Sequence, residues 1–169
     1  VHIPLLVALV TGDLLSGEAA MGTLRMLLTK PISRSQVVFS KLIAAAVYTF
    51  ILVIWMGFLA LVVGRWVFGT GDLIVLNSDG LVILNYQDIL WRYGLAFLVA
   101  YLALMTIATL SIAFSAFADN SIGPIVSTMA VIILFTIIGT LDVSVFYHVK
   151  PWLFTTHMAS WRSFFSDPV

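Results

Sequence analysis

The sequence predicts an all-α membrane protein, a polytopic bundle of transmembrane helices with three full spans plus the end of another. Hydrophobic residues make up 62% of the chain and charged residues only 9%. A soluble domain carries roughly 25% charged residues, so lipid has to be the solvent for most of this apolar surface. Long uncharged stretches that alternate with short charged segments are the second observation.

Three stretches are long enough and sufficiently free of charge to cross a bilayer. Leu42–Gly64 forms a helix of about 35 Å, which exceeds a hydrocarbon core of roughly 30 Å. Tyr93–Ala118 is longer and has to tilt. Ile122–Leu141 is the third span, and it follows Asn120 and Ser121, either of which can cap its first turn.

The first ten residues are apolar apart from His2. A signal peptide would begin with a basic region, and this segment has none. We therefore expect residues 1–10 to be the end of a further membrane helix, and the chain to be a fragment that lacks the beginning of that helix.

Residues 12–41 are too charged to cross the membrane, because each charge at the bilayer centre costs about 2.5–3.5 kcal/mol. Four Lys or Arg residues lie in this segment, against two in residues 65–92 and none in residues 119–121. The positive-inside rule therefore places residues 12–41 in the cytoplasm and residues 65–92 and 142–169 outside.

The outer segment, residues 65–92, holds two short β-branched runs on either side of Asn77–Gly80. Such runs around a turn sequence predict a β-hairpin. Asp88 and Arg92 stand four residues apart at the start of the next span, and this spacing predicts an ion pair on a helix.

The cytoplasmic segment has a distinct local design. Apolar residues at helical spacing predict a short amphipathic helix over Glu18–Leu28. Pro31 ends it, since a residue before proline is biased away from the helical region. Ser33 and Gln36 then fit a capping box, so a second helix is expected to begin at Arg34 and continue into the membrane.

The residue pattern leaves two interpretations of Glu18–Leu28 open. The first is a helix that lies on the membrane surface, in a non-transport scaffold or anchor. The second is a docking element for a cytoplasmic partner. The pattern alone favours the surface helix slightly.

A spaced motif runs through the same segment: Glu18, Gly22-Thr23, Leu24, Leu27-Leu28, Pro31, Ser33-Arg34 and Lys41. This motif resembles the first cytoplasmic loop of ABC-2 type transporter permeases, also described as type V exporters. In that family, the helix of this loop is the coupling helix and fits a groove on an ATP-hydrolysing subunit. The order of spans and loops also agrees with the family.

The resemblance implies that the chain is a non-catalytic permease subunit of an ATP-driven exporter, a multi-pass protein of the inner (plasma) membrane. The implied partners are an ABC ATPase subunit, which holds ATP and Mg²⁺, a second permease copy and the lipid bilayer; no cofactor is expected on this chain. Glu18 is the first choice for a polar contact with the ATPase. The full set of docking candidates is Glu18, Gly22, Thr23, Arg25, Leu28, Pro31 and Arg34.

Polar and aromatic side chains within the spans are candidates for a translocation path. Ser111 and Ser115 form a small-xxx-small face, for which close helix packing is the default interpretation and lining a substrate path the sharper one. The candidates are Trp55, Tyr101, Thr106, Ser111 and Ser115.

Other chemistry finds little support. Gly12–Gly17 has the glycine spacing of a P-loop, but Glu18-Ala19 replaces the Lys-Ser/Thr pair that binds nucleotide. His148 and His157 are nine residues apart, which is not a helical metal-ligand spacing. The chain has no cysteine, no hydrolase motif and a net charge of zero, so we expect no catalytic or metal site and no nucleic-acid partner.

Overall fold

A computed structural model describes residues 2–23, 33–69, 71, 73–77, 80–84, 86–141, 150, 153–158 and 160–165. Within these residues, four helices are long and apolar enough to cross a membrane, which confirms the predicted helical membrane fold. The elements are α1 (His2–Ala20), α3 (Arg34–Phe68), β1 (Leu73–Asn77), β2 (Gly80–Leu84), α4 (Tyr86–Ser115), α5 (Ile122–Thr140), α6 (Phe154–His157) and the 3₁₀ helix η3 (Ser160–Phe165).

Helix α1 extends well beyond its expected end at residue 10 and reaches Ala20. Its hydroxyl groups can be buried in this longer helix because they bond to carbonyls one turn back: Thr11 Oγ1 donates to Val7 O at 2.7 Å and Ser16 Oγ to Gly12 O at 2.7 Å. Residues that suggest a loop in the sequence thus form a buried helix face. Glu18 lies in the last turn of α1, and residues 24–28 of the predicted coupling helix lie outside the described residues.

Helix α3 begins at Arg34 through the predicted capping box. The Ser33 hydroxyl accepts from Gln36 N at 3.3 Å, and Ser33 N donates to Gln36 Oε1 at 2.9 Å. With 35 residues, α3 is about 52 Å long. It therefore extends beyond a hydrocarbon core of roughly 30 Å.

The Ser33→Ala variant is expected to lower the free energy of unfolding by about 1 kcal/mol, because the Gln36 amide loses its side-chain acceptor. Thermal unfolding in detergent, followed by circular dichroism, measures this loss. Ser35→Ala is the matched control, since the Ser35 hydroxyl contacts the Ser33 hydroxyl at 3.1 Å and does not cap a backbone amide of α3 within the described residues. Equal melting temperatures for the two variants would contradict the capping role.

The hairpin is confirmed: β1 and β2 pair antiparallel, with Asn77 opposite Gly80. Helix α4 starts at Tyr86, earlier than the predicted Tyr93. At the start of α5, Asn120 Oδ1 accepts from Gly123 N at 2.9 Å, so Asn120 is the capping side chain of the two candidates.

Near the start of α4, Asp88 and Arg92 were expected to pair with each other, but each of them bonds to a different residue. Arg92 Nη1 donates to Phe164 O of η3 at 3.0 Å. Asp88 Oδ1 accepts from Trp91 Nε1 at 3.4 Å. Arg92 therefore fastens the C-terminal segment to α4, and its side chain is buried there.

Helix α4 is the central element, since α1, α3, α5 and η3 all pack against it. The core lies between α1 and α4, around Val7, Ile107 and Ala108. The outward faces of α3 and α5 carry exposed apolar side chains such as Phe50 and Ile133, as expected for lipid-facing surfaces.

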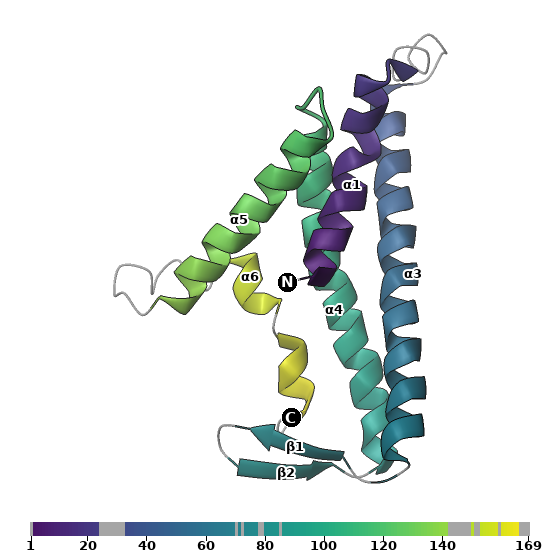
Figure 1. The fold of residues 1–169 in the computed structure, drawn as a ribbon, viewed down its shortest axis with the longest axis vertical. Helices are drawn as coiled ribbons and strands as arrows, with labels where there is room; N and C mark the ends of the chain where they lie inside the picture. Colours follow the sequence, from purple (N-terminus) through teal and green to yellow (C-terminus); the bar gives the residue numbers. More distant parts are fainter. Residues whose placement is uncertain are drawn as a thin grey trace.

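The end of α1, the start of α3 and the α4–α5 connection lie at one end of the bundle, and the hairpin lies at the other (Figure 1). Residues 18–23 and 33–41 of the predicted cytoplasmic segment therefore lie at the same end as residues 116–121, whereas residues 12–17 belong to the candidate span α1. The assignment of the first end to the cytoplasm stays a prediction. We call it the loop end and define it as residues 18–23, 33–41 and 116–121.

Candidate functional site

An ion pair joins two helices at the loop end. The Glu18 carboxylate in the last turn of α1 contacts the ammonium group of Lys41 on α3. The Lys41 side chain is 19% exposed and the Glu18 side chain 31%, so bulk water screens this pair only in part. The pair links α1 to α3 on either side of residues 24–32.

The sequence motif predicts a docking role for Glu18 and gives no sign that Lys41 is its partner. The two residues are 23 positions apart, and no helical spacing links them. The sequence shows only that the two opposite charges both belong to the charged segment, residues 12–41.

The other described docking candidates also lie at the loop end. Gly22 has a φ of 72°, a left-handed conformation that glycine adopts without strain. Thr23 is exposed, and its hydroxyl donates to Glu18 O at 3.1 Å. Arg34 is exposed in the first turn of α3. Arg25, Leu28 and Pro31 lie outside the described residues.

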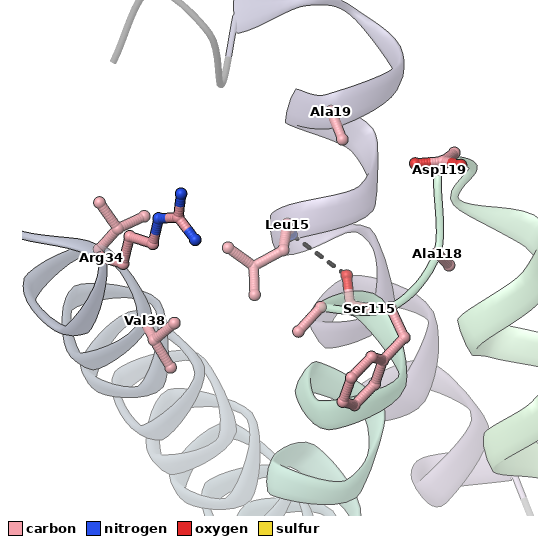
Figure 2. A pocket seen from close by; sticks show the side chains of 10 residues that line it. Leu15, Ala19, Arg34, Val38, Ser115, Ala118 and Asp119 are labelled. Carbon is pink, nitrogen blue, oxygen red and sulfur yellow. Dashed lines mark hydrogen bonds between the residues drawn. The ribbon is translucent and has the colours of Figure 1, made fainter. Parts of the chain in front are cut away.

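Two serines of α4 bond to the backbone of α1. Ser111 Oγ donates to Ala8 O at 2.9 Å, and Ser115 Oγ donates to Gly12 O at 2.6 Å. Ser115 Oγ also accepts from Ser16 N at 2.9 Å and from Leu15 N at 3.3 Å, the bond drawn in Figure 2. Both serine side chains are buried, so they serve the α1–α4 packing that their small-xxx-small spacing suggests.

Gly12 makes this close approach feasible. A Cβ atom at Gly12 would lie 2.9 Å from Ser111 Oγ and 3.1 Å from Ile125 Cγ1 of α5. Helices α1, α4 and α5 therefore meet at a point where a side chain has no room. In the sequence, Gly12 is recognisable only as part of an incomplete P-loop pattern, which gives no sign of this packing role.

The remaining path candidates do not share a surface with the serines. Trp55 is 59% exposed on α3 and stacks on Phe58, with ring centroids 6.0 Å apart. Tyr101 is half-buried and meets the edge of Phe50 at 5.7 Å. Thr106 is exposed and bonds to Ala103 O at 2.7 Å. A translocation path through all five candidates stays a prediction.

A pocket of about 360 Å³ lies at the loop end between α1, α3 and the end of α4 (Figure 2). Most of its wall is apolar, and Arg34 and Asp119 supply the charges. Its lining consists of Leu15, Ala19, Arg34, Val37, Val38, Ser115, Ala116, Phe117, Ala118 and Asp119.

Within the described part of the chain, no three side chains of His, Asp or Glu gather as a metal site would need. His157 is exposed at the end of α6, and His148 lies outside the described residues. The described residues thus offer a helix-packing centre, an interhelical ion pair and a pocket, all at or near the loop end.

Comparison with protein families gives a match to a family described as ABC-2 family transporter protein, over residues 1–158. Neither the curated proteins nor the solved structures gave a match. The matched interval contains all four long helices, the hairpin and the loop end. The chain therefore belongs to the ABC-2 transporter family, as the non-catalytic, multi-pass membrane permease component of an ABC transporter.

Proposed function

We propose that this chain is the permease subunit of an ATP-driven exporter, and that a separate ATPase subunit docks at the loop end. The observation that carries the proposal is the Glu18–Lys41 ion pair. It connects the end of the proposed docking segment directly to α3, the longest helix of the bundle. A displacement of residues 18–28 by the ATPase would therefore move α1 and α3 together.

The packing of the bundle gives this displacement a route into the membrane. Helix α1 packs on α4 and α5, and α3 packs on α4. The serine bonds to Ala8 O and Gly12 O tie α1 to α4 at fixed register. Rigid-body movement of packed helices is a common form of conformational switching. Here it would open a translocation path, shared with a second permease copy, alternately to the two sides of the membrane.

On this proposal, ATP binding and hydrolysis are the task of the partner subunit. ATP and Mg²⁺ belong on the partner subunit, because the glycine-spaced segment Gly12–Gly17 lacks the lysine of a P-loop and is part of helix α1. The exported substrate would meet spans whose exposed side chains are mostly apolar.

The competing function, a non-transport scaffold with a surface helix, needs no ATPase.

The Met21→Arg variant tests docking at the loop end. Met21 is 72% exposed just beyond α1, so a new charge there should disturb a partner surface more than the fold. We expect co-purification of the ATPase from detergent to fall about tenfold or more, a loss typical of a disrupted interface centre.

Phe68→Arg is the matched control, since Phe68 is 89% exposed at the opposite end of α3. It should leave ATPase binding unchanged. Normal ATPase binding and transport by Met21→Arg at wild-type abundance would show that docking occurs elsewhere. If no ATPase co-purifies with the wild-type chain, the scaffold is the better function.

A further inference from the structure

We propose that the loop-end pocket binds the headgroup of a zwitterionic aminophospholipid, with Arg34 at the phosphate and Asp119 at the ammonium. The pocket lies between α1, α3 and the end of α4. Its α3 wall belongs to residues 34–41, the polar start of a helix that is longer than the hydrocarbon core. A helix end that extends beyond the core lies at the level of the lipid headgroups. The lipid site does not require ATPase docking, although Arg34 is also a docking candidate.

The polarity of the pocket matches an amphiphile. Leu15, Val37 and Phe117 contribute apolar walls, and Phe117 is 91% exposed at the rim, where acyl chains could pass. The hydroxyl of Ser115 is already bonded to Gly12 O and Ser16 N. Arg34 and Asp119 are therefore the charged groups that the pocket offers to a ligand.

These two charges lie on opposite sides of the pocket, with Leu15 and Ser115 between them (Figure 2). A guanidinium group donates two parallel hydrogen bonds to phosphate oxygens. Arg34 is also the first residue of α3, so the positive end of the helix dipole adds to the attraction for an anion. Lys41 is neutralised by Glu18, which leaves the phosphate to Arg34.

Asp119 sets the preference among lipids. Its carboxylate can accept hydrogen bonds from the primary ammonium group of an ethanolamine headgroup, whereas a choline headgroup has no N–H to donate. It also repels an anionic headgroup that lacks a cation. The pair of charges thus favours an aminophospholipid over both alternatives.

The test is native mass spectrometry of the full-length transporter in detergent, titrated with dihexanoyl phosphatidylethanolamine, phosphatidylcholine or phosphatidylglycerol. We expect the ethanolamine lipid to bind about tenfold more tightly than the other two, the size of a charge-assisted hydrogen bond. Arg34→Gln should weaken all three lipids, and Asp119→Asn should weaken only the ethanolamine lipid, to the level of the choline lipid.

Arg65→Gln and Asp88→Asn carry the same changes away from the loop end and should leave all three affinities unchanged. Arg34 and Asp119 are both exposed, so their variants should fold. Equal binding of the three lipids by the wild type, or unchanged ethanolamine-lipid binding in Asp119→Asn, would overturn the proposal. Asp119 is not among the docking candidates, so this variant separates a failed lipid site from failed ATPase docking.

Discussion

Replacing Gly12 with valine should lower the free energy of unfolding by about 1–3 kcal/mol, the usual cost of forcing atoms into a packed core. The first added atom would meet Ser111 Oγ at 2.9 Å, Ile125 Cγ1 at 3.1 Å and Ile125 N at 3.5 Å. The serine cannot move away without losing its bond to Ala8 O. Valine adds two further carbons, so α1 would have to separate from α4 and α5. Thermal unfolding in detergent, followed by tryptophan fluorescence, measures the effect.

Gly94→Val is the control for this substitution. Gly94 lies within α4, and no described atom lies within 4 Å of a Cβ placed there. Its variant should melt close to the wild type. The double variant Gly12→Ala/Ser111→Ala should be more stable than the sum of its single variants predicts, because removal of the serine oxygen relieves the 2.9 Å contact. Equal stability of Gly12→Val and Gly94→Val would contradict the close approach.

Reversing the charge of Glu18 should abolish ATPase-driven transport, because the Glu18→Lys variant places a second ammonium group against Lys41. The original pair is partly buried, so loss of its attraction and the new repulsion together lower the free energy of unfolding by about 1–2 kcal/mol. The repulsion would push α1 and α3 apart where the pair now joins them. The measurements are the melting temperature and the transport-linked ATPase activity of the purified complex.

The exchange variant Glu18→Lys/Lys41→Glu decides what Glu18 does. If the ion pair within the chain is what matters, the exchange restores both measurements. If Glu18 contacts the ATPase, as the sequence motif predicts, melting recovers while ATPase activity stays lost. Full activity of the single variant Glu18→Lys would exclude both roles.

The presence of the spans and the start of α3 were predictable because local rules decide them. Charge-free length predicts the membrane helices, the Ser33 and Gln36 side chains predict the start of α3, and β-branched runs predict the hairpin. The predicted end of α1 at residue 10 was wrong, because Thr11, Gly12 and Ser16 are residue types that are common in loops. They become a buried helix face only when Ser115 bonds to Gly12 O across 103 positions of sequence.

Residues of the candidate site were predictable only where the residues that form it lie on the same helix. Ser111 and Ser115 share one helix face, and the sequence identifies that face. The groups they meet lie on another helix, so sequence spacing could not identify Gly12 or the Glu18–Lys41 pair. Arg92 shows the same limit, because its partner Phe164 O is supplied by a segment that folds back from 72 positions away.

The way α3 is held has a mechanical consequence. Its buried residues recur at steps of four or eight and form one stripe that winds slowly around the helix: Val37, Ala45, Thr49, Val53 and Gly57. A rod about 52 Å long that is supported along one stripe can act as a lever. A tilt of about 10° about its middle would move each end by about 5 Å, roughly one helical turn. A small push at the Arg34 end of α3 would thus arrive at the hairpin end as a movement of equal size and opposite direction.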